Sequence, residues 1–197
     1  MENGLSELKE KFKVVMVGDS SVGKTSLFLR FDNKPFTRNA TPTVGAACIN
    51  AKVEMSETTV HLMVWDTAGQ DSFRHIIPMY FNRAAFILVV FDLTSIDSLK
   101  SVEDWVILAK NRTPEDSVLI LIGNKSDLVD ERKIARDDVR SLVQSLRIAN
   151  YFETSALSGD GIDSVLLEIG IRALALRNNE KQGIDLQRQP KNRDCCT

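Results

Sequence analysis

The sequence is poor in cysteine and histidine and contains no long apolar segment. Its 197 residues include three cysteines and two histidines, and neither His61 nor His75 has a Cys or His partner at the spacing of a zinc site. Three cysteines do not form the even-numbered disulfide framework of a small secreted protein. No apolar run reaches the roughly eighteen residues of a membrane-spanning helix, and the first residues do not resemble a signal peptide. We therefore expect a cytosolic protein without structural zinc.

The chain also lacks a strong net charge of either sign. Its 25 Lys and Arg residues nearly balance its 27 Asp and Glu residues, which leaves a net charge of −2. We therefore expect no nucleic-acid partner, because binding of that kind needs a basic field. With 43% hydrophobic residues the chain can bury a substantial core. We expect a monomer with an N-terminal extension over residues 1–10, one domain over 11–177 and a flexible, hypervariable tail over 178–197.

One stretch carries a specific chemical signal. Residues 18–25 read Gly-Asp-Ser-Ser-Val-Gly-Lys-Thr and match the phosphate-binding pattern G-x-x-x-x-G-K-[ST]. The pattern is informative when it lies between a strand and a helix. Here an apolar run over 14–17 precedes it and a helix-like segment over 26–31 follows it. The flanking sequence therefore supports the motif.

Each residue type in this loop has a part in binding phosphate. Gly18 and Gly23 allow a tight turn whose N–H groups point inward at a helix N-terminus, where a polyanion is stabilised. Lys24 would reach the terminal phosphates, and the hydroxyl of Thr25 would bind a Mg²⁺ ion that bridges them. The loop predicts a site for a phosphorylated ligand with Mg²⁺.

The rest of the chain alternates strand-like and helix-like segments. A short first strand over 14–17 follows a polar lead-in over 9–13 that we expect to be exposed, and two loops, over 32–43 and 67–83, flank a hairpin. The expected elements are a hairpin over 49–66, strands over 86–91, 118–122 and 151–153, and helices over 96–109, 136–146 and 162–177. Such alternation predicts an α/β fold with a parallel sheet covered on both sides.

Polar motifs follow two of the expected strands. Asp66 ends one strand, where its carboxylate can hold Mg²⁺ through water, and Gly69 exposes an N–H to a terminal phosphate. Residues 124–127 read Asn-Lys-Ser-Asp after another strand. The carboxylate of Asp127 can accept two hydrogen bonds from the N1–H and 2-amino groups of guanine, and adenine offers no such pair of donors. The ligand is therefore predicted to be a guanine nucleotide.

In this order the motifs resemble those of the Ras superfamily of small GTPases, and most closely its Rab branch. The resemblance covers about residues 10–177. Its motifs are G-D-S-S-V-G-K-T, Pro42 and Thr43, Trp65 with D-T-A-G-Q, Phe73 and Arg74, N-K-S-D, residues 153–156 (Glu-Thr-Ser-Ala) and the two terminal cysteines. It implies an α/β, three-layer P-loop G domain. Its sheet is expected to have six strands, mostly parallel with one antiparallel edge strand, and helices on both faces.

The resemblance also implies roles for residues outside the phosphate loop. Thr43 is a second Mg²⁺ ligand that senses the γ-phosphate, Gln70 orients the attacking water, and Lys24 is the other catalytic residue. The full set expected to contact GTP or GDP is Gly18, Ser20, Ser21, Val22, Gly23, Lys24, Thr25, Ser26, Phe36, Thr43, Asp66, Gly69, Asn124, Lys125, Asp127, Ser155, Ala156 and Leu157, with Thr25, Thr43 and Asp66 holding Mg²⁺.

At the base end of the site, the resemblance places Asn124 and Asp127 around guanine and Lys125 along the nucleotide. The N–H of Ala156 meets the guanine O6, and Phe36 lies against the purine face.

The sequence departs from the Rab pattern at four places. Ser21 stands where Rab proteins commonly have glycine, and Ala40 replaces a common tyrosine. Residues 44–48 read Val-Gly-Ala-Ala-Cys instead of I-G-V-D-F, and Leu157 replaces the lysine of S-A-K. The altered 44–48 segment faces effectors in Rab proteins, so the identity of the effectors stays open.

The chain ends in Cys195, Cys196 and Thr197, which resembles the C-C-x ending of Rab proteins. Both cysteines are then expected to carry geranylgeranyl groups, and two lipids give a stable anchor where one does not. The resemblance places the protein peripherally on the cytosolic face of an intracellular membrane. It implies an exchange factor, a GTPase-activating protein, effectors, a GDP-dissociation inhibitor and the prenylation machinery as partners.

These observations predict a GTP-hydrolysing switch in vesicle and membrane trafficking, slow without its activating protein. Two alternatives stay open. A metabolic P-loop kinase or ATPase would need a second substrate site, and residues 124–127 argue against it. A GTP-bound scaffold that hardly hydrolyses is suggested by Ser21, and Gln70 argues against that.

Overall fold

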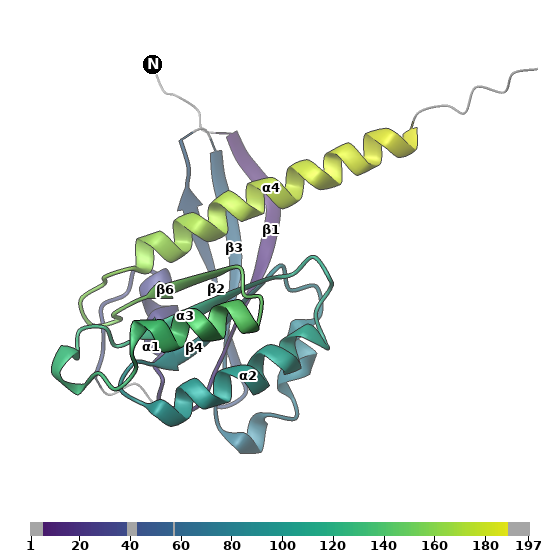
Figure 1. Cartoon of the computed structure of the whole chain (residues 1–197). Helices are drawn as coiled ribbons and strands as arrows, with labels where there is room; N and C mark the ends of the chain where they lie inside the picture. Colours follow the sequence, from purple (N-terminus) through teal and green to yellow (C-terminus); the bar gives the residue numbers. More distant parts are fainter. Residues whose placement is uncertain (1–5, 39–42, 57, 189–197) are drawn as a thin grey trace, which may run out of the picture.

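A computed structural model describes residues 6–38, 43–56 and 58–188 (Figure 1). Across these residues the elements are β1 (Ser6–Val17), α1 (Lys24–Phe31), β2 (Ala46–Glu54), β3 (Thr58–Thr67), β4 (Phe86–Asp92), α2 (Ile96–Lys110), β5 (Val118–Asn124), α3 (Arg136–Ser145), β6 (Asn150–Glu153) and α4 (Ile162–Arg188). Short 3-10 helices span Asp71–Phe73, Ile77–Phe81 and Val129–Glu131. Among the described residues, no helix combines the length and apolar character needed to cross a lipid bilayer.

The strands form one sheet in the order β2-β3-β1-β4-β5-β6. β2 pairs antiparallel with β3, and every other neighbouring pair is parallel. β4 is buried along its whole length, as a strand covered on both faces should be. The predicted fold class, with one antiparallel edge strand on a parallel sheet, is confirmed.

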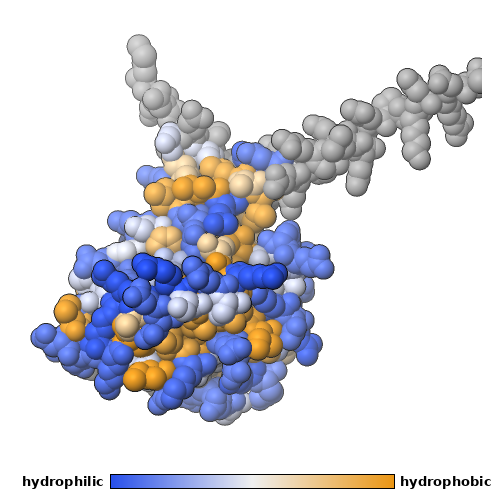
Figure 2. Space-filling model, in the orientation of Figure 1, coloured by the Kyte–Doolittle hydropathy of each residue, from blue (hydrophilic) through white to orange (hydrophobic). Residues whose placement is uncertain are grey.

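Helices cover both faces of the sheet and divide its core in two. On one face, Leu27 and Phe28 of α1 and Ile169 of α4 pack with strand residues such as Met16 and Leu88. On the other face, α2 and α3 pack through Trp105, Val139 and their neighbours. Figure 2 shows mostly hydrophilic residues on the visible surface, with hydrophobic residues gathered beside α4 in the upper part of the view. The domain therefore has three layers.

The parallel arrangement brings the chemistry-bearing loops to one edge of the sheet. β1 leads through the phosphate loop into α1, β3 contains Asp66, and β5 ends at Asn124. A Cβ at Gly18, where φ is +142°, would lie 2.1 Å from the carbonyl oxygen of Val90 in β4. Only glycine fits there, and the phosphate loop therefore lies directly against the end of the central strand.

The expected start of β1 is wrong. Residues 9–13 are not a lead-in outside the sheet, because β1 begins at Ser6 and pairs with β3 through Lys11 and Lys13, although Lys11 is exposed as expected. Backbone hydrogen bonds define a strand, and they do not require an apolar side chain at every position. Residues 6–10, which we expected in an N-terminal extension, are therefore part of the sheet.

The expected end of the last helix is also wrong, since α4 continues from Arg177 to Arg188. The fall in hydrophobicity after residue 177 marks where the helix leaves the sheet and not where it ends. Figure 1 shows α4 running beyond the sheet at that end. Glu, Lys, Gln, Leu and Arg are good helix formers and predominate in this extension. Gly170 lets the helix approach the sheet closely, since a Cβ there would lie 2.9 Å from the sulfur of Met55.

Candidate functional site

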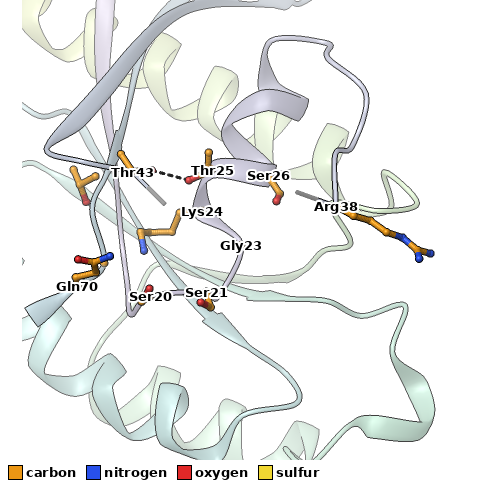
Figure 3. Close-up of a pocket in the computed structure, with 11 residues that line it drawn as sticks. Ser20, Ser21, Gly23, Lys24, Thr25, Ser26, Arg38, Thr43 and Gln70 are labelled. Carbon is orange, nitrogen blue, oxygen red and sulfur yellow. Dashed lines mark hydrogen bonds between the residues drawn. The ribbon is translucent and has the colours of Figure 1, made fainter. Parts of the chain in front are cut away.

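Two adjoining cavities lie around the phosphate loop, and Figure 3 shows the first. The first has a volume of about 230 Å³ and is lined by Ser20, Ser21, Gly23, Lys24, Thr25, Ser26, Arg38, Thr43, Thr67, Gly69 and Gln70. The second, of about 360 Å³, is lined by Ser21, Gly23, Ser26, Phe36, Arg38, Asn124, Lys125, Asp127, Leu128, Ala156 and Leu157. Four residues line both cavities, so the two form one groove of the size that small ligands occupy.

The first cavity contains a buried lysine. Lys24, at the start of α1, is only 5% exposed, and its Nζ donates to the carbonyl oxygens of Gly18 at 2.8 Å and Asp19 at 2.7 Å. Burial lowers its pKa to about 8, although the charges of Asp66 and Asp19 act in the opposite direction. A buried ammonium group held only by carbonyl oxygens is well placed to bind an anion.

Beside Lys24, two hydroxyl groups converge on one carboxylate. The Oγ1 atoms of Thr25 and Thr43 donate to Asp66 Oδ2 at 2.7 and 2.9 Å. The two Oγ1 atoms lie 2.9 Å from each other, as Figure 3 shows with a dashed line. Asp66 is fully buried, and its Oδ1 has no hydrogen-bond partner among the described residues. Burial raises the pKa of Asp66, against the two hydroxyl bonds and Lys24.

This cluster fits a Mg²⁺ ion. Carboxylate and hydroxyl oxygens are the hard ligands that Mg²⁺ prefers, and the ion commonly takes one or two carboxylates together with substrate phosphates. The described part of the chain contains no group of three His, Cys, Asp or Glu side chains placed to hold a metal. One carboxylate with two hydroxyls therefore suits Mg²⁺ better than zinc.

The segment after β3 closes this side of the groove. A Cβ at Gly69 would lie 2.3 Å from Lys24 Nζ and 2.5 Å from the carbonyl oxygen of Asp19, so the Gly69 backbone touches the phosphate loop. Gln70 lines the same cavity (Figure 3). Both predicted residues thus line the same cavity as Lys24.

Two phosphate-loop residues have features that phosphate binding alone does not explain. Ser21 adopts a left-handed conformation with φ of +64°, which costs a residue with a side chain about 1–2 kcal/mol relative to glycine. Val22 points into the hydrophobic core and is 2% exposed, so its side chain does not line the groove. Its carbonyl oxygen instead accepts a hydrogen bond at 2.9 Å from Nδ2 of Asn124.

At the second cavity, Asn124 joins three segments of the chain. Besides donating to Val22, its Oδ1 accepts from Thr154 Oγ1 at 3.2 Å and from the N–H of Ala156 at 3.3 Å. The Ala156 N–H that we expected at the guanine O6 is therefore engaged with Asn124. Lys125, in a left-handed conformation, forms an ion pair at 2.6 Å with Asp92 at the end of β4. Asn124 and Lys125 thus hold the loops together at the base end.

A buried serine forms a hydrogen bond with Asp127. The hydroxyl of Ser155, which is fully buried, donates to Asp127 Oδ1 at 2.5 Å and accepts from the N–H of Ser158 at 3.0 Å. Asp127 itself lines the second cavity. Phe36 and Leu157 line the same cavity.

Sequence reasoning missed an arginine that supports this end of the groove. Arg30 of α1 donates through Nε to the carbonyl oxygen of Ala156 and through Nη2 to that of Leu157, both at 2.7 Å. No sequence motif marks Arg30, and its helical position between the core residues Leu27 and Phe31 is the only hint. Ala40, Pro42, Cys195 and Cys196 lie outside the described residues.

Comparison with known proteins identifies related chains. The family model described as "Ras family" matches residues 13–175. The chain is 33% identical over 191 residues to the Ras-related protein Rab-22A of Canis lupus familiaris and of Homo sapiens, covering 94% of this chain and 98% of each relative. It is 33% identical over 168 residues to the Ras-related protein RabJ of Dictyostelium discoideum, covering 85% of this chain and 65% of that relative.

The buried Lys24 predicts a linkage between ligand binding and protonation. A bound polyphosphate should raise the pKa of Lys24 from about 8, so binding at about pH 8.5 should take up protons, and affinity should fall as the pH rises from about 8 towards 10.5. Calorimetric titration with GDP in two buffers of different ionisation enthalpy measures this uptake. Lys24→Arg, whose guanidinium does not titrate in this range, is the control. Equal uptake by both proteins would contradict the assignment to Lys24.

Proposed function

Because the chain belongs to the Ras family of small GTPases and is Rab-like, we propose that its groove holds GTP or GDP with Mg²⁺ and that bound nucleotide sets the conformation of the two loops around Thr43 and Gly69. A Rab-like small GTPase binds and hydrolyses GTP and acts in membrane trafficking. Residues 11–177, together with residues 6–10 of β1, are proposed as the nucleotide-binding domain.

The contact between Thr25, Thr43 and Asp66 is the observation that carries this proposal. It joins the phosphate loop, the loop before β2 and the end of β3 through three oxygen atoms within 2.9 Å of one another. When bound there, Mg²⁺ would neutralise charge on the β- and γ-phosphates. Thr43 joins this cluster from the loop before β2, and in the proposed site it would hold the same Mg²⁺ as Thr25 and Asp66. Its loop is therefore the segment that loss of the γ-phosphate should release.

Hydrolysis needs positioning and charge stabilisation more than covalent chemistry. Lys24 would supply a positive charge at the terminal phosphates. The Gly69 backbone lies against Lys24, so its N–H would bind the same group. Gln70 is exposed at the mouth of the cavity, where its amide would orient a water molecule for attack.

Gln70→Leu tests the catalytic part of the proposal. The variant should lower the single-turnover rate of GTP hydrolysis at least about tenfold, because leucine has no polar group to orient water. Gln144→Leu, at an exposed position of α3, is the matched control and should leave the rate unchanged. Equal rates for Gln70→Leu and wild type would remove Gln70 from catalysis and favour a scaffold that stays bound to GTP.

The base end of the groove supports the choice of guanine. Asp127 lines the second cavity and accepts a hydrogen bond from Ser155 on Oδ1. A guanine base would pair its N1–H and 2-amino groups with this carboxylate. Adenine in the same place offers neither of these donors, so the carboxylate would lose both hydrogen bonds to the base, which is strongly unfavourable.

Asp127→Asn should exchange guanine for xanthine specificity. The asparagine amide can donate to the 2-oxo group of xanthine but cannot accept both guanine donors, so GTP affinity should fall by roughly 10⁴-fold and xanthosine triphosphate should become the preferred ligand. Competition binding with the two nucleotides measures the change. Asp130→Asn, an exposed residue outside the cavity, carries the same loss of charge and should bind GTP normally. GTP affinity that stayed unchanged in Asp127→Asn would refute the guanine assignment.

Membrane attachment and the partner proteins also belong to this proposal. Cys195 and Cys196 are proposed as geranylgeranyl sites that hold the protein on the cytosolic face of an intracellular membrane. An exchange factor, a GTPase-activating protein, effectors, a GDP-dissociation inhibitor and prenylation enzymes are proposed as partners. The Rab-like sequence of the chain and its C-C-x ending support these assignments.

Replacing both Cys195 and Cys196 with serine should move the protein from the membrane fraction to the cytosol, since neither lipid could then be attached. Fractionation of cells that express each form measures the distribution. Cys48→Ser is the matched control, because Cys48 is an exposed free thiol on β2 and should not affect the anchor. Membrane association that persisted in the double variant would overturn the lipid-anchor assignment.

A further inference from the structure

A tryptophan on α2 holds the phosphate loop from outside the groove. Trp105 is 2% exposed, and its Nε1–H donates to Asp19 Oδ1 at 2.8 Å. Asp19 is the second residue of the phosphate loop and does not line either cavity. The bond links α2, on one face of the sheet, to the loop that leads into α1 on the other face.

The backbone of Asp19 touches two parts of the site. Its carbonyl oxygen accepts the 2.7 Å hydrogen bond from Lys24 Nζ. The same oxygen would lie 2.5 Å from a Cβ at Gly69, so the segment before Gln70 rests against it. A shift of Asp19 would therefore move the partner of Lys24 and the support of Gly69 together.

The same indole ring also contacts an arginine from residues 69–74, which we call the Gln70 segment. The guanidinium carbon of Arg74 lies 4.5 Å from the Trp105 ring centroid, a cation–π contact. Arg74 follows the 3-10 helix Asp71–Phe73, and its Nη2 lies 3.5 Å from Asp104, the neighbour of Trp105. One indole thus contacts the phosphate loop through its N–H and the Gln70 segment through its ring.

We propose that Trp105 is a positioning residue that couples the Gln70 segment to the phosphate loop. Its N–H fixes Asp19, and through Asp19 the position of Lys24, while its ring gives Arg74 a place to stack when the Gln70 segment is closed over the groove. Trp105 acts through Asp19 and touches no nucleotide itself. This inference rests on the proposed function of the groove.

The two tryptophans of the chain provide a matched comparison. Trp105→Phe keeps an aromatic ring but removes the N–H that Asp19 accepts. Trp65→Phe removes an indole N–H that has no partner among the described residues. We expect Trp105→Phe to release bound GDP on the order of tenfold faster than wild type, with Trp65→Phe close to wild type. Stopped-flow displacement of a fluorescent GDP measures both rates.

Variants of Asp19 separate positioning from a general packing role. Asp19→Asn keeps an oxygen that accepts the indole N–H and should release GDP nearly as wild type does, whereas Asp19→Ala should match Trp105→Phe. Combining Asp19→Ala with Trp105→Phe should add no further change, since both remove one interaction. Additive effects, or equal release rates for Trp105→Phe and Trp65→Phe, would overturn the proposal.

The Arg74 contact is tested by fluorescence in the Trp65→Phe background, where Trp105 is the only tryptophan. Exchange of GDP for a non-hydrolysable GTP analogue should shift the Trp105 emission, because it changes whether Arg74 stacks on the ring. Arg74→Ala should abolish that shift and leave GDP binding in place. A shift that persisted in Arg74→Ala, or none in its parent, would refute the coupling. Failure of wild-type protein to bind any guanine nucleotide would instead refute the proposed function.

Discussion

The site depends on the hydrogen bonds that the buried carboxylate of Asp66 accepts. A fully buried charge needs compensation, and Lys24 and the hydroxyls of Thr25 and Thr43 supply part of it. This requirement draws together three segments that are distant in sequence. The remaining carboxylate oxygen has no partner among the described residues, which leaves a ligand position for a cation. The same carboxylate thus holds three segments together and offers an oxygen to a cation.

The rest of the groove is built by hydrogen bonds between loops. Asn124 bridges the phosphate loop and the segment after β6, while Arg30 holds that segment from α1. Ser155 orients Asp127, and Trp105 holds Asp19. Asn124, Ser155 and Trp105 are buried, so their bonds are both strong and costly to leave unmade. The loops that line the groove are therefore preorganised by hydrogen bonds with one another and with α1 and α2.

Much of the fold and the site could be predicted from the sequence. The strand and helix periodicity identified the sheet and its helices, because those patterns reflect burial directly. The ends of β1 and α4 were missed, since their outer residues extend beyond the core and carry no such pattern. Arg30 and Trp105 were missed for another reason. Their partners are 126 and 86 residues away in the chain, and no local spacing reports such contacts.

The sequence alone determined which chemical groups are available and in what order. The phosphate loop, the D-T-A-G-Q and N-K-S-D motifs and the C-C-x ending are local patterns, and their residue types and spacing are what predicted a ligand for each. Only the tertiary structure decided how those groups meet. The parallel sheet brings the ends of β1, β3 and β5 to one edge, and packing across both faces places Arg30 and Trp105 behind the loops. Long-range contacts of this kind depend on the whole fold, because each joins segments that are close only once the sheet has formed.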